Sequence, residues 1–458
     1  MYDVIVIGGG SGGYAGAIRA SQLGGKVALI EGGQMGGTCV NRGCIPSKIW
    51  LHAAAILDQT RKAGEFGIKA SVDALDLAAI TDRKNGVSSD IRMGMEALLQ
   101  NNGVDVIRGR GTLKSGREVL VDGQVVAGKN IIIATGSSLA VPDVPGLAEA
   151  AWTSDQLLEA TAIPASVLVT DPGFIGVELA FLLAVFGAKV TIAVPTPRIL
   201  PAEDQDTSQR LAQSLRERGV TILTRQTLAS VAPAGDGFAC LLSGNGKEQA
   251  VEVAKVLVST RKPNVEGLGL EALGIKRKDD GGIAVDDRLR TAVPTVYAIG
   301  DATGGLMLSH GASSMAVCAA ENCLGQGGKY AAHLVTRALW TVPQMGAVGL
   351  SEEEAEKRGL NVEVGGFPYS INGYAMLRGE VDGAVKIVTD ADTGEILGVH
   401  IVGGAATETI GEAVLAMQLE CTVAELARGI RVHPAFCETV VDAARDAAGW
   451  ALYLPRRS

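Results

Sequence analysis

Two cysteines near the N-terminus have the spacing of a reactive thiol pair. Cys39 and Cys44 stand five residues apart close to a predicted helix start, and such a pair can close a small disulfide ring. The positive end of a helix lowers the pKa of a nearby thiol and favours the nucleophilic thiolate. Structural zinc needs two further ligands and closer spacing within each pair, and no second pair supplies them. The pair therefore favours thiol–disulfide chemistry.

A histidine and a carboxylate near the C-terminus form a second candidate set. His433 precedes Glu438 by five residues. Histidine can transfer protons near neutral pH, especially when a carboxylate orients it. A histidine without a catalytic role is the alternative interpretation, and Glu438 together with the cysteine pair weighs against it. The other histidines lack such a partner in the sequence and are interpreted as structural: His52, His310, His333 and His400.

The remaining cysteines give weaker evidence of a redox function. Cys318 and Cys323 repeat the five-residue step, but they belong to a predicted helix of small residues and are expected to pack inside. An odd total of seven in 458 residues argues against a secreted disulfide framework. In a reducing compartment, a disulfide is more often catalytic than structural.

The first forty residues predict a βαβ unit that binds a dinucleotide. Gly8 permits the tight turn, Gly10 allows the backbone to approach a pyrophosphate, and Gly13 allows close helix packing. Glu31 ends the second strand, where a carboxylate accepts ribose hydroxyls. The predicted elements are a strand at 4–7, a turn at 8–13, a helix at 14–23 and a strand at 26–30.

A second unit of the same kind is predicted from residue 166, with a damaged fingerprint. Gly173 and Gly176 are kept, but Asp171 replaces the first glycine and is followed by Pro172. Val194 replaces the acid at the strand end. A carboxylate at this turn is expected to repel phosphate. The predicted elements are a strand at 166–170, a turn at 171–176, a helix at 177–186 and a strand at 189–194.

The sequence also predicts two further buried strands and, after them, a C-terminal region with a different pattern of strands and helices. Buried strands are expected at 129–136, which ends at Thr135-Gly136, and at 293–301, which ends at Asp301. From about residue 335, strand-like stretches precede two helical stretches and predict a separate α+β domain. The strands are expected near 346–350, 362–369, 384–388 and 396–403, and the helices near 407–419 and 422–427.

The composition limits the class of partner. The net charge is −9 and no long block of like charges occurs, so nucleic-acid binding has little support. No apolar run reaches the length of a membrane span. The first residues lack a basic segment and run into glycines, which is typical of a buried strand rather than a signal peptide. These features predict a cytoplasmic protein with no membrane partner.

Four segments together resemble the pyridine nucleotide-disulfide oxidoreductases, over essentially the whole chain. The segment 36–48 contains the cysteine pair, and its ending Ile45-Pro46-Ser47-Lys48 favours the lipoamide branch over the glutathione branch. The other segments are Ala134-Thr135-Gly136, Ile299-Gly300-Asp301 and the His-Pro…Glu segment at 433–438.

The resemblance implies an α/β homodimer with FAD as cofactor. Each chain would hold two Rossmann-like dinucleotide-binding domains and a C-terminal α+β dimerisation domain. The expected domains are an FAD-binding domain at 1–147, an NAD(P)-binding-like domain at 148–262, a central part at 263–334 that returns to the FAD domain, and an interface domain at 335–458.

The resemblance also implies roles for individual residues. Cys39 would exchange with the substrate disulfide, and Cys44 would lie beside the flavin and give a charge-transfer thiolate when reduced. His433 would reach in from the partner subunit, oriented by Glu438. Lys48 would lie near flavin N5 and pair with Glu178. Expected FAD contacts are Gly8, Gly10, Gly13, Glu31, Thr38, Thr135, Gly136 and Asp301; no metal ligands are expected.

Departures from the family pattern cluster in the nicotinamide-like domain. Besides Asp171 and Val194, Pro195 stands where arginine follows in NADP-using relatives, and Thr260 replaces a glycine. Two interpretations remain open. NAD binds with weaker ribose contacts, or the flavin exchanges electrons with another carrier or protein. Gly173, Gly176 and Glu178 are retained in this domain.

The active-site segments have two smaller departures. Arg42 lies between the cysteines, where the family usually has a small apolar residue. It would acidify a thiol, meet an anionic partner or simply be solvated. Cys437 stands where serine is common, as a packed thiol or a third redox thiol.

The expected reaction is oxidation of dihydrolipoamide, with electrons passing through the Cys39–Cys44 disulfide and FAD to NAD or a substitute acceptor. The substrate would be a lipoyl-bearing protein or a small disulfide compound. One alternative is a reductase of another disulfide that uses a non-nicotinamide electron carrier, for example a protein. A second alternative is a non-catalytic flavoprotein partner.

Overall fold

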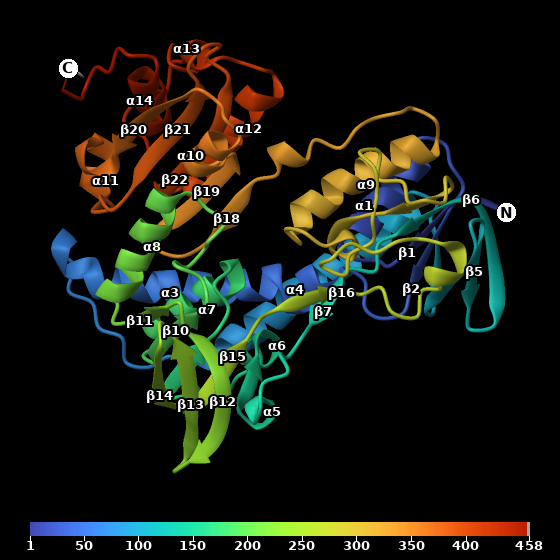
Figure 1. Cartoon of the computed structure of the whole chain (residues 1–458), viewed down its shortest axis with the longest axis horizontal. Helices are drawn as coiled ribbons and strands as arrows, with labels where there is room; N and C mark the ends of the chain where they lie inside the picture. Colours follow the sequence, from blue (N-terminus) through green and yellow to red (C-terminus); the bar gives the residue numbers. More distant parts are fainter. Residues whose placement is uncertain (456–458) are drawn as a thin grey trace.

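The computed structural model describes residues 1–455, which form three connected bodies (Figure 1). The body at the right of Figure 1 is built on a seven-stranded sheet whose central strands are parallel. The strand β17 joins this sheet beside β6, although a whole body separates the two in sequence. The strands are β3 (Asp105–Arg108), β2 (Val27–Glu31), β1 (Tyr2–Ile7), β6 (Gln124–Ile133), β5 (Glu118–Val121), β4 (Gly111–Ser115) and β17 (Val296–Ala298).

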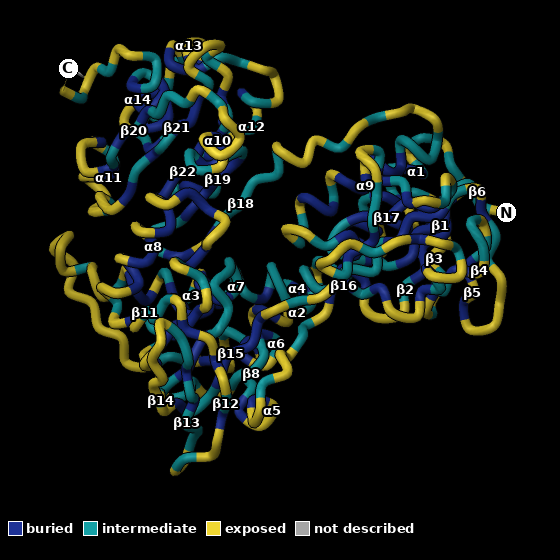
Figure 2. Tube along the Cα trace, viewed as in Figure 1, coloured by how far each residue is buried: buried dark blue, intermediate teal, exposed yellow. Residues whose placement is uncertain are grey.

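Two helices of small residues cover this sheet. The helix α1 (Ser11–Gln22) packs on α9 (Ser309–Cys323), and Ala17 and Ala20 share a buried cluster with Ala316. Small side chains let the helix axes approach each other and the strands closely. In Figure 2 the buried segments are concentrated in the inner strands and in the helix faces that cover them (Figure 2).

The lowest body in Figure 1 repeats the parallel arrangement. Its central helix, α7 (Phe174–Val185), has nine buried residues out of twelve, so it is enclosed on all sides. It packs between the sheet and α3 (Cys44–Lys62), whose Trp50 is fully buried in the same cluster. The parallel strands are β11 (Thr221–Thr224), β10 (Lys189–Val194), β9 (Ser166–Val169), β15 (Lys255–Val258) and β8 (Ala151–Thr153).

Smaller elements connect the first two bodies. An antiparallel three-stranded sheet flanks the second body, and a two-stranded ladder of β7 and β16 lies between the bodies. The long helices α3 and α4 (Leu77–Asn101) also run between them (Figure 1). The strands are β12 (Thr227–Ala234), β13 (Gly237–Gly244), β14 (Lys247–Val253), β7 (Ser137–Leu139) and β16 (Arg261–Pro263), and the short helices are α2 (Gly37–Arg42), α5 (Leu147–Ala150) and α6 (Ser154–Leu157).

The third body, at the upper left of Figure 1, is an antiparallel five-stranded sheet with helices on one face. Residues of α12 and α14 form its core with Val399 and Ile401 of the central strand. The strands are β18 (Arg337–Leu339), β19 (Gln344–Gly349), β22 (Ile396–Gly403), β21 (Ala384–Asp390) and β20 (Val362–Pro368). The helices are α10 (Glu352–Lys357), α11 (Gly373–Arg378), α12 (Ala406–Gln418), α13 (Val423–Leu426) and α14 (Glu438–Ala447).

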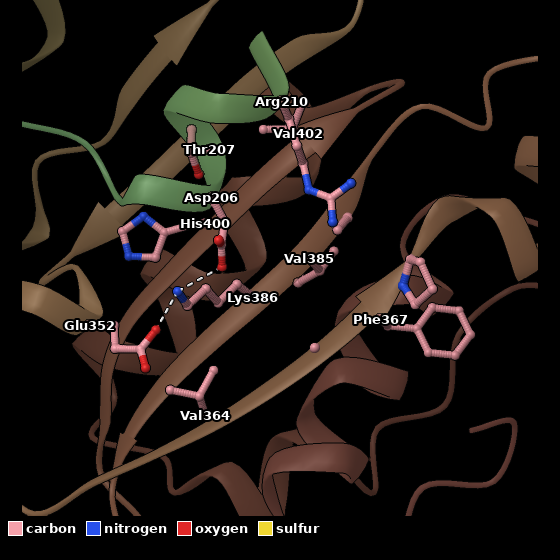
Figure 3. A pocket seen from close by; sticks show the side chains of 13 residues that line it. Asp206, Thr207, Arg210, Glu352, Val364, Phe367, Val385, Lys386, His400 and Val402 are labelled. Atoms are coloured by element: carbon pink, nitrogen blue, oxygen red, sulfur yellow. Dashed lines mark hydrogen bonds and ion pairs between the residues drawn. The ribbon is translucent and has the colours of Figure 1, made fainter. Parts of the chain in front are cut away.

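A charge cluster joins the other face of this sheet to α8 (Gln205–Glu217) of the second body. Lys386 on β21 lies 3.0 Å from Asp204 and Asp206 and 2.5 Å from Glu352. Figure 3 shows Lys386 between Asp206 and Glu352 (Figure 3). Burial alone would raise the pKa of Asp204, but His400 and Lys386 outweigh burial, so the pKa lies below its usual value.

The predicted fold class is confirmed, with local corrections. Both fingerprint helices begin three residues earlier than predicted, at Ser11 and Phe174, because the middle glycine of each turn is already the N-cap. The strand predicted at 129–136 ends at Ile133. The strand predicted at 293–301 is reduced to β17, and Asp301 lies in a 3-10 turn that begins at Gly300.

The last three residues of the predicted 335–458 domain lie outside the described residues. Within residues 1–455, no helix combines the length and apolar character needed to cross a membrane.

Lys386→Met should loosen the contact between the second and third bodies. The substitution leaves the buried Asp204 carboxylate without its cation, which costs about 3 kcal/mol. The pKa of Asp204 is lower in the folded state than in the unfolded state. The stability that its ionised carboxylate contributes is therefore present above the unfolded-state pKa and is lost as the pH falls through the folded-state pKa. The urea midpoint should therefore fall at pH 7, and the difference from wild type should shrink below about pH 4. Lys357→Met on the exposed side of α10 is the control, and equal midpoints for both variants would contradict the expectation.

Candidate active site

The two candidate redox cysteines lie on either side of a helix break. Cys39 belongs to α2, and α3 begins at Cys44, with Gly43 between the helices. The chain enters α2 through Gly36 and Gly37, whose φ angles of +91° and +55° are costly for other residues. Both cysteines are half-buried free thiols and share a hydrogen bond. The break therefore brings two thiols together that one straight helix would separate.

The shared hydrogen bond makes the two thiols unequal. Cys44 donates to Cys39 and lowers the pKa of Cys39 to about 6, which burial opposes and the nearby Lys48 supports. The same hydrogen bond and burial raise the pKa of Cys44. The helix end at Cys44 favours a thiolate at that residue, whereas the shared hydrogen bond lowers the pKa of Cys39 and raises that of Cys44.

Two serines next to Cys39 were not identified from the sequence. The hydroxyls of Ser309 and Ser11 hydrogen-bond to Cys39 and lower its pKa further. They also hydrogen-bond to each other at 2.6 Å between the oxygens. Ser11 lies within the first glycine-rich turn, but Ser309 comes from α9 and no local signal in the sequence links it to Cys39.

Lys48 and Glu178 meet at the junction of the bodies, as their expected pairing requires. Lys48 Nζ lies 2.8 and 3.0 Å from the two oxygens of Glu178, a buried carboxylate on α7. Trp340, between β18 and β19, donates its backbone N–H to Glu178 at 3.0 Å, and its ring lies under Lys48 at 4.3 Å. The pair is thus held by all three bodies, and Trp340 is a neighbour that sequence reasoning missed.

The first glycine-rich turn has the geometry of a pyrophosphate cradle. A Cβ on Gly8 would lie 2.3 Å from the oxygen of Ala134, and one on Gly13 would lie 1.7 Å from the oxygen of Gly8. At Gly10 the nearest atom would be 3.8 Å away, so space remains above the turn. Glu31 accepts the backbone N–H of Gly9 at 2.6 Å, at the expected strand end.

Two other expected FAD contacts, Thr38 and Asp301, lie around a half-buried arginine. Ser137 donates to Asp301 at 2.5 Å, and Arg261 donates to Ser137 at 2.8 Å and to Thr38 at 3.2 Å. Burial lowers the pKa of Arg261, opposed by Asp301. The structure links Thr38 to Asp301 through Arg261 and Ser137, neither of which was among the expected FAD contacts.

Thr135 and Gly136 follow the end of β6, where Thr135 is hydrogen-bonded to the segment that contains Asn264. Thr135 donates its hydroxyl to the backbone oxygen of Asn264 at 2.7 Å, and Asn264 returns a side-chain hydrogen bond at 3.1 Å. Gly136 has a φ of +72°. Together with the glycine cradle and Glu31, this donor and acceptor set fits the diphosphate, ribose and polyol of FAD.

His433 and Glu438 form the expected pair at the start of α14. His433 Nδ1 lies 2.9 Å from a Glu438 oxygen, and the other oxygen accepts the N–H of Ala435 at 2.8 Å. The His433 side chain is 78% exposed, and Figure 2 shows α14 and α2 in separate parts of the chain. The structure therefore does not bring His433 to the cysteines of its own chain.

Arg42 and Cys437 occupy different settings. The Arg42 side chain is exposed, and its Nε lies 3.9 Å from Asp155. Burial raises the pKa of Asp155, opposed by Arg42 and Arg261. Cys437 is half-buried and directly precedes α14. Arg42 is thus an exposed cation that lies between the two cysteines in sequence and faces Asp155.

Gly173 and Gly176 open α7, in the second glycine-rich turn. Gly173 donates its N–H to the side chain of Asp171 at 2.8 Å. A Cβ on Gly176 would lie 2.2 Å from the backbone oxygen of Asp171, so this glycine keeps the helix close to the turn. The packing function of the fingerprint is retained here.

Comparison with protein families gives a match over nearly the whole chain. Residues 2–316 match the pyridine nucleotide-disulphide oxidoreductase model, and residues 335–444 match the dimerisation domain of the same family.

Individual relatives and solved structures agree with that match. The chain is 38% identical to a dihydrolipoyl dehydrogenase from Thermus scotoductus, over 100% of this chain and 99% of the relative. It is 39% identical to one from Zymomonas mobilis, over 99% of each. The solved structure of LpdA from Mycobacterium tuberculosis superimposes with a TM-score of 0.87 at 28% identity, over 96% of this chain and 98% of that one. The HOCl-induced flavoprotein disulfide reductase RclA from Escherichia coli gives 0.83 at 28% identity, over 96% and 99%.

Cys44→Ala should make Cys39 a weaker acid in the reduced protein. Alanine removes the hydrogen bond that contributes most to the low pKa of Cys39. The alkylation rate of Cys39, followed against pH by mass spectrometry of its peptide, should rise with a midpoint near pH 6 in wild type and at higher pH in the variant. Cys421→Ala, remote from the pair, is the control. An unshifted midpoint would show that Cys44 does not acidify Cys39.

Proposed function

The chain belongs to the pyridine nucleotide-disulphide oxidoreductase family, and we propose that it oxidises protein-bound dihydrolipoamide. It is an FAD-dependent disulfide oxidoreductase, in line with its dihydrolipoyl dehydrogenase relatives. The observation that carries the proposal is the Cys39 and Cys44 thiol pair at the edge of the first glycine cradle. We place the reaction in the cytoplasm, which the sparse cysteine content supports.

The proposed domain assignment follows the sheets. The expected FAD domain at 1–147 and the central part at 263–334 share one sheet, because β17 pairs with β6. The expected nicotinamide-like domain at 148–262 contains the second parallel sheet. The expected interface domain from residue 335 coincides with the start of the family's dimerisation domain.

In the proposed reaction, two successive thiol exchanges move an electron pair onto the cysteines. A substrate thiolate attacks Cys39 in the oxidised pair, the Cys39–Cys44 bond breaks, and Cys44 leaves as a thiolate. The second substrate sulfur then attacks the first, which closes the substrate disulfide and releases Cys39. The substrate loses two electrons and two protons, and the cysteine pair gains the electrons. Bound FAD supplies the capacity to accept this electron pair.

His433 is the proposed proton carrier for both exchanges. Because Nδ1 faces Glu438, Nε2 is left to take a proton from the substrate thiol and return it to a leaving sulfur. The second hydrogen bond of Glu438, to Ala435, fixes the direction of the imidazole. Since His433 is exposed on its own chain, we propose that it serves the cysteines of the second subunit in a two-fold dimer.

Lys48 and Glu178 are the proposed flavin-side charges. The buried Glu178 fixes the ammonium of Lys48 four residues after Cys44, on the same helix. A fixed positive charge near the cysteines stabilises thiolate in the reduced pair. The proposed FAD contacts are those expected from the sequence, with Arg261 and Ser137 added because they bind Thr38 and Asp301.

A reductase of another disulfide is the second candidate function. Arg42 favours it, because an exposed arginine beside the thiol pair suits an anionic disulfide substrate. A non-catalytic flavoprotein is less compatible with the chain, since the Cys39–Cys44 and His433–Glu438 contacts are both present.

Purified wild-type protein should be yellow and should oxidise dihydrolipoamide with ferricyanide as electron acceptor. Cys44→Ser should lower this activity by at least about a thousandfold, because the exchanged disulfide can no longer form. Cys421→Ser, outside the site, should retain it. The proposal fails if Cys44→Ser keeps a tenth of the wild-type rate, or if wild type reduces glutathione disulfide while leaving dihydrolipoamide unchanged.

Hybrid dimers test whether His433 acts across the subunit interface. Co-expressed Cys39→Ser and His433→Gln chains form mixed dimers in which one of the two sites has both intact residues. Random pairing makes half of the dimers mixed, so the mixture should recover about a quarter of wild-type activity while each parent variant is inactive. Affinity tags on the two chains allow the mixed dimer to be purified. An inactive mixed dimer would place His433 in its own subunit.

A further inference from the structure

The second glycine-rich turn is the place where the family would bind a nicotinamide dinucleotide, and its residues do not fit one. The pyrophosphate of a dinucleotide binds to free backbone N–H groups where a glycine-rich turn enters a helix. In this chain, the N–H of Gly173 at the start of α7 is already donated to Asp171 Oδ1 at 2.8 Å. The donor that should face a phosphate therefore faces a carboxylate of the chain itself.

The Asp171 carboxylate is held by a helix start and by the end of a strand. Its second oxygen, Oδ2, accepts the hydroxyl of Ser259 at 2.5 Å, and Ser259 follows the end of β15. Both oxygens of Asp171 are thus bound, one by the helix start and one by the neighbouring strand end. The chain itself therefore occupies both oxygens of this carboxylate, and the Gly173 N–H is taken up in the process.

The first unit shows what the same position requires when a dinucleotide is to bind. The register of β1 and β6 places Gly8 opposite Ala134, and a side chain at Gly8 would lie 2.3 Å from the Ala134 oxygen. In the second unit, the paired register of β9 and β15 ends at Val169 and Leu257, and continuing it by two residues places Asp171 opposite Ser259, to which it is hydrogen-bonded. Here the side chain is accommodated, and the facing residue is its hydrogen-bond partner. The second turn thus contains a carboxylate at the position where the first turn has a glycine, and hydrogen bonds within the chain hold that carboxylate in place.

The ribose end of the second unit lacks its contacts as well. Val194 at the end of β10 is fully buried and offers no side-chain acceptor for a ribose diol. Arg198, the next cation along the chain, binds both oxygens of Glu353 at 2.9 and 3.1 Å and donates to the backbone of Glu203. The guanidinium of Arg198 is therefore already bound by Glu353 of the third body and does not supply a free cation for a 2′-phosphate.

We propose that Asp171 is an internal anion at the pyrophosphate position, and that it sets the affinity of this chain for NAD(H) and NADP(H). The inference rests on the proposed function only in that the reaction needs an acceptor for its electrons. It assigns Asp171 a specificity-determining role that is independent of the disulfide substrate. Gly176, the packing glycine, keeps the unit folded while Asp171 closes its phosphate site.

ADP-ribose is the suitable probe, because it carries the pyrophosphate and both riboses but cannot react with the flavin. Calorimetric titration of the FAD-loaded wild-type protein should give a dissociation constant of about 1 mM or weaker. Asp171→Gly removes the carboxylate and frees the Gly173 N–H, and binding should tighten at least about tenfold. Asp171→Asn keeps the size and removes the charge, so it should tighten binding by a smaller factor.

Asp390→Asn is the matched control. Asp390 also accepts backbone N–H groups within its own turn, at Asp392 and Thr393, but it lies on the third body. The dissociation constant of the Asp390→Asn variant for ADP-ribose should equal that of the wild-type protein. FAD content and the visible spectrum report folding of every variant, and Asp171→Asn carries the test if Asp171→Gly does not fold.

A kinetic readout separates binding from chemistry. With NADH as reductant, Asp171→Gly should lower the KM more than it raises kcat for flavin reduction, since Asp171 does not touch the reacting atoms. Unchanged ADP-ribose dissociation constants in both Asp171 variants would overturn the inference, whether wild type binds tightly or weakly. Failure of wild type to oxidise dihydrolipoamide with ferricyanide would instead remove the proposed function and leave the ADP-ribose result standing.

Discussion

The ion pair between Lys48 and the buried Glu178 is the contact on which the arrangement of the site depends. Lys48 comes from the helix that carries Cys44, Glu178 comes from the enclosed helix of the second body, and Trp340 of the third body closes the pair from the other side. A buried carboxylate without its cation is costly, so this pair strongly disfavours separation of the bodies. The position of Cys44 relative to the second unit is therefore fixed by electrostatics as well as by apolar packing.

A glycine-rich fingerprint usually serves both helix packing and phosphate binding, and the two dinucleotide units of this chain show these two functions separately. Gly13 and Gly176 both allow a helix to approach its turn closely, and both are required by the backbone. Gly8 and Asp171 differ, and this difference affects what lies above the turn rather than the turn itself. A Rossmann-like unit can thus keep its packing and its place between neighbouring bodies while its phosphate position changes character.

The sequence predicted the parts of the fold that depend on local pattern. The glycine fingerprints located both parallel units, and the family resemblance implied the contact between His433 and Glu438 that the structure contains. Apart from Lys48 and Glu178, whose pairing the family resemblance implied, the partners contributed by distant segments were not predicted. Ser259 meets Asp171 across 88 residues, and Arg261 meets Thr38 across 223 residues, so no periodicity or spacing connects them. Local rules also placed the helix starts late, because they counted fingerprint residues as turn.

The pairing of β6 with β17 has a consequence for synthesis of the chain on the ribosome. β6 ends at Ile133, while β17 begins at Val296, and the helix α9 that completes the same core follows at Ser309. The second body lies between them, and its sheet is complete once β15 has emerged at Val258. The inserted body therefore has all its strands during translation while the body that begins at the N-terminus still lacks an edge strand and a covering helix. The N-terminal sheet therefore keeps an open edge and an uncovered apolar face until α9 has been translated, and during this time it is open to non-native contacts.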